Sequence, residues 1–290
     1  MVNLIPSDRQ AAGQNTVLLQ QAVDKASQEG GTIFLPKGVF YFASAGKDCL
    51  YRGIRRQHTI GEHVILCRDN VTIIGQGKDT VLRPIGETAE GLDMFYYNEF
   101  LDSGTTVGSY LSNDHFRAFC IDSSETSCRQ YTTAGKGFML NLCRDCTWEE
   151  VEVYHTDGTG FGMDCTVRCR IDHCYAEGCG KGATENDGGA SGFGIGYGFS
   201  EEESMTIRDC TSIGNTKFGF FFEHQARFMK QYKAAGHGEF LVESCTAKDN
   251  LYDFGGMMSE HVTYRSCRSL GARAKDFYFG DGSHDITLEG

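Results

Sequence analysis

The feature that most constrains this chain is a short phrase that recurs through its second half. The phrase is built on a phenylalanine that is usually followed by glycine, as in GTGFGMD at 158–164 and SGFGIGY at 191–197. Its copies are 23 to 36 residues apart, which is typical of solenoids in which each repeat forms one coil. The phenylalanines that mark the copies are Phe138, Phe161, Phe193, Phe218, Phe254 and Phe277.

A second phrase, built on a cysteine, alternates with the first. Apolar or small residues recur five and three positions before this cysteine and two positions after it, which indicates stacked parallel strands facing one interior. Asn215 and Asn250, each five residues after such a cysteine, predict a ladder at a corner where the backbone is left-handed. The cysteines are Cys174, Cys210, Cys245 and Cys267.

Thirteen cysteines also raise the alternative of a zinc site, because Cys143 and Cys146 form a CxxC pair. The repeat register explains Cys174 without a metal, so we expect the cysteines to be small apolar core residues. No metal or other cofactor is expected. Calcium stays possible, although no run of ligands like that of an EF-hand is present.

The N-terminal segment predicts a helix followed by two strands. Over residues 15–29, apolar residues recur with helical spacing, Asn15 or Thr16 is a suitable N-cap, and Gly30 ends the helix. Residues 32–42 then read as a strand, a Pro-Lys-Gly turn and a second strand.

GGTIFLPKGVFYF at 30–42 and DNVTIIGQGKDTVL at 69–82 carry a family resemblance. Together with the helix, they resemble the entry to the right-handed parallel β-helix proteins of the pectin-lyase-like superfamily. The resemblance implies an all-β solenoid whose N-terminal end is capped by the helix. It implies one domain over 1–290, with a cap region at 1–45 and coils over 60–290.

The same resemblance implies a carbohydrate-active enzyme on a polysaccharide or oligosaccharide. Such enzymes include polysaccharide lyases, glycoside hydrolases and C5-epimerases. HTDGTGFGMD at 155–164 is similar to the NTDG segment of polygalacturonase-like hydrolases, but their paired-aspartate and RxK segments are missing. VEVYHTDGTGFGMD at 151–164 is similar to a segment of alginate C5-epimerases, but it lacks their Pro-His-Glu. The rival interpretation is a non-catalytic glycan-binding or structural module, such as a piece of a phage tail fibre or adhesin.

Charge and hydropathy exclude other partners. The net charge of −12 argues against nucleic acid, whose phosphates require clustered lysine and arginine. No apolar run is long enough to span a membrane. The first residues, MVNLIPSDRQ, lack the apolar core of a secretory signal, so a cytoplasmic or phage-associated protein is expected if this N-terminus is the natural one. A homo-oligomer is possible.

The residue after the repeated phenylalanine should point outward, and it is glycine at positions 162, 194, 219 and 255. A column of glycines predicts a flat strip on which a ligand can lie, and local crowding is the alternative explanation. Insertions at 123–135 and 182–190 should project from one edge of this strip, and an insertion at 225–238 from the other.

Titratable residues along the strip suggest two kinds of chemistry. Hydrolysis needs two carboxyl groups, for which Asp164, Glu223 and Asp157 are candidates. Elimination or epimerisation needs a base, an acid and a neutralising cation, for which Tyr197, His224 and Arg144 are candidates. The expected catalytic residues are Asp164, Tyr197, Glu223 and His224. The expected substrate-binding residues are Arg144, His155, Asp157, Glu260 and Asp281.

Overall fold

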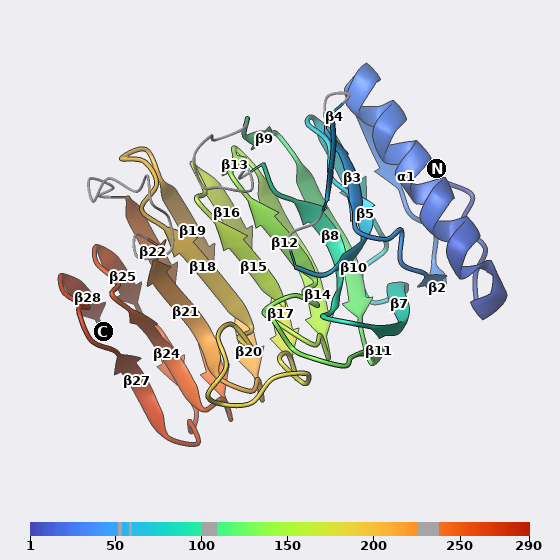
Figure 1. The fold of residues 1–290 in the computed structure, drawn as a ribbon. Helices are drawn as coiled ribbons and strands as arrows, with labels where there is room; N and C mark the ends of the chain where they lie inside the picture. Colours follow the sequence, from blue (N-terminus) through green and yellow to red (C-terminus); the bar gives the residue numbers. More distant parts are fainter. Residues whose placement is uncertain (52–53, 58–59, 100–108, 226–237) are drawn as a thin grey trace.

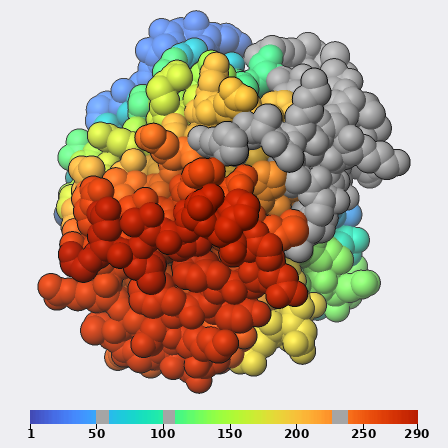
Figure 2. Space-filling view, turned by 90° about the vertical axis from the view of Figure 1, so that its left-hand side faces the viewer, coloured from blue at the N-terminus to red at the C-terminus, as the bar shows by residue number. Residues whose placement is uncertain are grey.

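The computed structural model describes residues 1–51, 54–57, 60–99, 109–225 and 238–290. The chain is a parallel β-helix in which successive coils stack side by side, with one long helix across the N-terminal end (Figure 1). Seen from the opposite end, the C-terminal coils cover the earlier ones (Figure 2). The predicted fold class is therefore confirmed.

One long face of the solenoid is a parallel sheet of eight strands, in the order β27-β24-β21-β18-β15-β12-β8-β5. These strands are β5 (Glu62–Leu66), β8 (Leu92–Tyr97), β12 (Phe138–Asn141), β15 (Phe161–Asp164), β18 (Phe193–Tyr197), β21 (Phe218–His224), β24 (Tyr252–Met257) and β27 (Lys275–Phe279). We call this the phenylalanine sheet.

The remaining faces form a sheet of sixteen strands and two small pairs. The sixteen are β1 (Gly31–Phe34), β2 (Gly38–Phe42), β6 (Val71–Ile74), β7 (Thr80–Thr88), β10 (His115–Asp122), β11 (Glu125–Cys128), β14 (Thr147–Tyr154), β16 (Cys169–Asp172), β17 (Tyr175–Glu177), β19 (Ser204–Arg208), β20 (Thr211–Ile213), β22 (Glu239–Glu243), β23 (Thr246–Lys248), β25 (Val262–Arg265), β26 (Arg268–Ser269) and β28 (Ile286–Glu289). The pairs are β9 (Leu111–Ser112) with β13 (Cys143–Arg144), and β3 (Asp48–Tyr51) with β4 (Ile54–Gln57).

A stack of phenylalanine rings runs through the core beneath the phenylalanine sheet. Neighbouring rings lie 4.7 to 5.4 Å apart, and every pair is close to parallel. The register of the strands places one ring from each coil in this column. Its members are Phe95, Phe138, Phe161, Phe193, Phe220, Phe254 and Phe277.

The sequence interpretation was wrong about one member of this column. It assigned Phe218, whereas Phe220 is the residue that pairs with Phe193 and Phe254. Phe218 instead pairs with Tyr252 at the start of the two strands. Strand β21 holds four phenylalanines in five positions, so its repeat phrase could be aligned in two ways that differ by two residues.

The cysteine column is a core column, as expected. Cys174, Cys210 and Cys245 are buried, and their thiols donate to backbone carbonyls. Burial raises the pKa of the Cys210 and Cys245 thiols well above its usual value, so they stay protonated.

The asparagine ladder exists, but its backbone differs from the expectation. Asn215 donates its backbone N–H and its side-chain amide to Asn250 Oδ1, at 2.9 and 2.7 Å. The left-handed residue is the one before each asparagine, Gly214 and Asp249, rather than the asparagine itself. Both amides are fully buried, so they tie adjacent coils together inside the corner.

Helix α1 (Ala12–Glu29) packs on the first coil and starts earlier than predicted, after a short 3-10 turn, η1 (Arg9–Ala11). Asn15 and Thr16 are not its N-cap. They are buried, and their side chains hydrogen-bond the backbone of Tyr41 and Ala43, which fastens the helix to β2. Among the residues that the structure describes, no helix is long and apolar enough to cross a bilayer.

Glu203 is a buried carboxyl at the turn before β19. It is 1% exposed, and it accepts the backbone N–H groups of Gly198 and Phe199. Burial nevertheless raises its pKa from 4.5 to about 7, because removal from water disfavours the charged form more than the two donors favour it.

We predict that replacing Asn250 with alanine lowers the free energy of unfolding by about 3 kcal/mol, because buried donors on Asn215 and the carboxylate of Asp253 lose their partner. Urea denaturation followed by circular dichroism measures this change. The exposed neighbour Lys248, replaced with alanine, should change stability by less than about 0.5 kcal/mol. A loss below about 1 kcal/mol for Asn250→Ala would contradict the structural role of the ladder.

We also predict that the free energy of unfolding falls as the pH rises from 4.5 to 7. In that range the folded protein holds a proton on Glu203 that the unfolded chain has released, so rising pH favours unfolding. The full effect is about 3 kcal/mol, and Glu203→Gln should remove it. The exposed Glu201→Gln is the matched control in the same turn. An unchanged pH profile in Glu203→Gln would refute the assignment.

Candidate functional site

A row of polar residues crosses the outer face of the phenylalanine sheet. Because side chains alternate along a strand, the residue three positions after each inward phenylalanine points outward. The register aligns Asn141 with Asp164, Asp164 with Gly196, and Gly196 with Glu223. Four adjacent coils, through β12, β15, β18 and β21, thus each contribute one residue to a single line, which we call the carboxylate row.

Gly196 is the position in this row that carries no side chain. A Cβ at Gly196 would overlap Asp164 Oδ1 and Gln225 Nε2, so these two side chains fill the space above the glycine. Gln225 Nε2 also lies 3.4 Å from Glu223 Oε2. The amide of Gln225 therefore lies near both carboxyl groups of the row.

Asp164 lies beside a cation. Burial raises the pKa of the Asp164 carboxyl, while the positive charge of Lys136 works in the opposite direction. The Lys136 side chain lies flat across Gly162, with its Nζ 3.2 Å from Met139 Sδ. A cation and two carboxyl groups thus share one surface.

Asn141 adds a hydrogen-bond acceptor to the row. The residue is 6% exposed, and its buried Oδ1 accepts no hydrogen bond from the residues that the structure describes. An unpaired buried acceptor costs about 1–3 kcal/mol, so a donor that reaches Oδ1 would be stabilised there.

The interpretation of a bare glycine strip was wrong in two respects. Gly219 is not in the column, because Phe221 is the residue that pairs with Gly194 and Gly255. The space above the remaining glycines is filled by neighbouring side chains, such as Lys136 over Gly162. The alternative of local crowding therefore explains the glycines, which let these side chains lie flat on the sheet.

Tyr197 and His224 lie inside the solenoid, so their expected exposure on the strip was wrong. Tyr197 is 0% exposed, and its hydroxyl donates to the Glu260 carbonyl at 3.0 Å. His224 Nε2 is 3.5 Å from Glu260 Oε1, and its ring meets the Tyr197 ring edge-on. The two residues follow one position after the outward row on β18 and β21, and alternation turns them inward.

Arg144 and Asp281 lie away from the carboxylate row. The Arg144 guanidinium stacks over the Tyr110 ring at 4.4 Å and pairs with Glu202 at 3.1 Å, at the corner after β12. Asp281 is exposed in the turn after β27. The structure brings neither residue together with Asp164 and Glu223.

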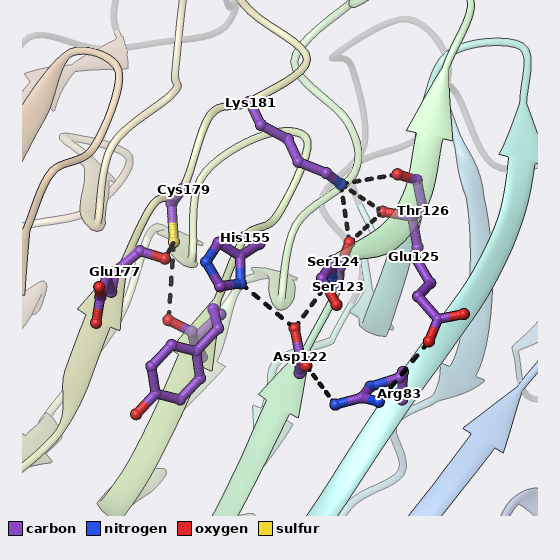
Figure 3. A network of polar contacts seen from close by, with 12 residues as sticks. Arg83, Asp122, Ser123, Ser124, Glu125, Thr126, His155, Glu177, Cys179 and Lys181 are labelled. Carbon is purple, nitrogen blue, oxygen red and sulfur yellow. Dashed lines mark hydrogen bonds and ion pairs between the residues drawn. The ribbon is translucent and has the colours of Figure 1, made fainter.

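His155 belongs to a separate polar network near β10 and β11 (Figure 3). Asp157 joins this network through Lys181 and Thr126. His155 Nδ1 is 3.4 Å from Asp122, which also pairs with Arg83. Asp157 is buried, and its carboxylate binds Lys181 Nζ at 2.9 Å.

Lys181 also donates to the carbonyls of Ser123 and Thr126, so this network joins the roots of two of the predicted insertions. Farther out, Tyr131 donates to the Gly188 carbonyl at 3.0 Å, which brings 123–135 and 182–190 together. Residues 226–237 of the third insertion lie outside the described residues.

Sequence reasoning missed Lys136 and Gln225. Both reach the row from the connections beside their strands, so no strand periodicity marks them. The only indication in the sequence was that each glycine on the outer face leaves room for the side chain of another residue.

The described residues contain no group of three or more histidine, cysteine or acidic side chains placed to hold a metal ion. Cys143 and Cys146 are buried in the core.

The chain is similar in fold to several solved proteins. The A-module of mannuronan C-5 epimerase AlgE4 from Azotobacter vinelandii is 17% identical with a TM-score of 0.58, and the match covers 94% of this chain and 72% of that one. The Agl-KA catalytic domain is 14% identical with a TM-score of 0.61, covering 94% and 44%. A mutant tailspike protein of E. coli bacteriophage HK620, in complex with a pentasaccharide, is 12% identical with a TM-score of 0.62, covering 99% and 47%.

No curated protein matches the sequence. The family described as "right handed beta helix region" matches residues 118–290, which is more than half of the chain. The chain therefore belongs to the family of right-handed β-helix proteins.

Proposed function

We propose that this protein is a glycoside hydrolase that cleaves a polysaccharide or oligosaccharide on the outer face of the phenylalanine sheet. The observation that carries the proposal is the carboxylate row, in which Asp164 and Glu223 lie on the two strands that flank Gly196. Glycosidic hydrolysis requires two carboxyl groups on either side of the bond that breaks.

The two carboxyl groups have different roles in this proposal. Asp164, whose burial raises its pKa, is the general acid that protonates the glycosidic oxygen. Glu223 is the general base that takes a proton from the attacking water. The water adds to the anomeric carbon as the bond to the leaving oxygen breaks. Direct attack of the water inverts the configuration at the anomeric carbon.

Two further residues would hold the sugar in place. Asn141 Oδ1 would accept a hydrogen bond from a sugar hydroxyl, which satisfies its buried unpaired oxygen. Lys136 would bind a sugar carboxylate or hydroxyl above Gly162. When the bound sugar displaces solvent from the site, the dielectric constant there falls and these polar contacts become stronger.

Hydrolysis is favoured over elimination or epimerisation by the positions of the other candidates. Tyr197 and His224 are inside the solenoid, and Arg144 is engaged at a separate corner. The fold neighbours support a carbohydrate ligand in general terms, since they include a mannuronan C-5 epimerase and a tailspike in complex with a pentasaccharide. Fold likeness at this level does not select the reaction.

We predict that Asp164→Asn and Glu223→Gln each lower kcat by about 10²- to 10⁴-fold, because each removes one proton transfer from the reaction. The measurement is the release of reducing ends from a panel of polysaccharides, with ultraviolet absorbance followed in parallel to detect unsaturated products of elimination. Asp249→Asn, an exposed acid in a turn between β23 and β24, is the control and should keep full activity.

Three results would contradict the proposal. Formation of an unsaturated product would show elimination, in which no water is added to the cleaved ends. Full activity in both variants would place the reaction elsewhere. Glycan binding without any change of the glycan would support a binding module instead.

A further inference from the structure

Four aromatic rings form a cluster on the outer face of the phenylalanine sheet, beyond the carboxylate row. They come from β21, β24 and β27 in the last three coils. Ring centroids lie 4.6 Å apart for Phe218–Phe221, 5.0 Å for Phe218–Tyr252 and 4.4 Å for Tyr252–Tyr278. The core does not require these rings, because the inward column is already filled by other phenylalanines.

The cluster is held rigidly on the sheet. Phe218 is only 1% exposed, although it does not belong to the interior column, because the other rings cover it. A Cβ at Gly255 would lie 2.9 Å from the Phe218 ring, so the glycine makes room for that ring to lie against the backbone. Phe221, Tyr252 and Tyr278 remain half-buried and reach the surface. The cluster is therefore a supported aromatic platform rather than scattered surface residues.

The platform lies beside the carboxylate row on the same face of the sheet. Phe221 is two residues before Glu223 on the same face of β21, and it pairs with Gly194 of β18. The register continues the row itself from Glu223 to Met257, whereas Phe221 is in line with Gly255 and Tyr278. Because two residues span roughly 7 Å of a strand, a glycan with one sugar beside Glu223 can place the next sugar on Phe221.

The chemistry around the rings fits a sugar. Aromatic faces pack against the C–H face of a pyranose. A tyrosine adds a hydroxyl to the apolar area of its ring. Tyr252 and Tyr278 supply hydroxyls, and Lys275 Nζ lies 5.0 Å from the Tyr278 ring centre. The two hydroxyls and the Lys275 ammonium group can each hydrogen-bond a sugar.

We propose that this platform is a glycan-binding subsite, with Phe221 as the ring on which a sugar of the substrate stacks. The inference rests on the proposed function for its substrate class, a polysaccharide. It adds the position on the protein where the polysaccharide continues beyond the bond that is cleaved. Phe218 acts by positioning Phe221 and does not itself contact the sugar.

The test measures binding separately from cleavage. Affinity gel electrophoresis in gels that contain alginate, polygalacturonate, dextran or a bacterial O-antigen polysaccharide reports the dissociation constant for each polymer. For the polymer that retards the parent protein, Phe221→Ala should weaken binding about tenfold, and Phe221→Trp should retain it. Tyr175→Ala, a half-buried outward aromatic on β17 of the other sheet, should bind as the parent does. Circular dichroism of each variant checks the fold.

The outcomes separate the two proposals. If the parent cleaves a polymer but Phe221→Ala binds it as tightly as the parent, the subsite is refuted and hydrolysis stands. If the parent binds without cleavage and Phe221→Ala loses binding, hydrolysis is refuted and the subsite stands. If none of the four polymers retards the parent, both are refuted. Loss of binding in Phe221→Trp as well would also contradict stacking at this position.

Discussion

The stack of phenylalanine rings is the interaction on which the rest of this structure depends. Seven coils each place one ring in the same column, and all the rings except that of Phe277 are fully buried. Burying a phenylalanine side chain contributes about 1.5–3 kcal/mol, so the column favours one register over its alternatives. A slip of one residue would turn every ring to the solvent side.

That register determines which residues can act together. It aligns Asp164, Gly196 and Glu223 on three neighbouring strands, although they are far apart in the sequence. The same alternation separates Glu223 from His224, its neighbour in the chain, by turning the histidine toward Glu260. In a solenoid, the spacing of a residue from the repeated phenylalanine therefore predicts whether its side chain points into the core or outward. It does not by itself predict the function of the residue.

Much of the fold could be predicted because it is repeated. Columns such as Cys174 and Cys210 recur at constant offsets, and the capping helix has its own apolar stripe. The alignment of β21 could not be predicted, because phenylalanines at 218, 220, 221 and 222 satisfy the phrase in more than one way. That ambiguity placed Gly219 on the outer face and hid the aromatic cluster.

The candidate site was less accessible to sequence reasoning. Asp164 and Glu223 were found because they continue the repeat phrase. Lys136 and Gln225 reach across from connecting segments, and only side-chain packing over glycine reveals them. Tyr197 was misplaced because an aromatic with a hydroxyl suits either a surface or a core that offers an acceptor, here the Glu260 carbonyl.

The central claim is that the carboxylate row is where a glycan is bound and cut. A crystal structure of the Glu223→Gln variant with an oligosaccharide of the cleaved polymer tests this most directly. The account predicts a sugar over Gly196, with its glycosidic oxygen within hydrogen-bond distance of Asp164 and the next sugar toward Phe221. A sugar bound instead beside His155 and Asp122, on the other sheet, would contradict it.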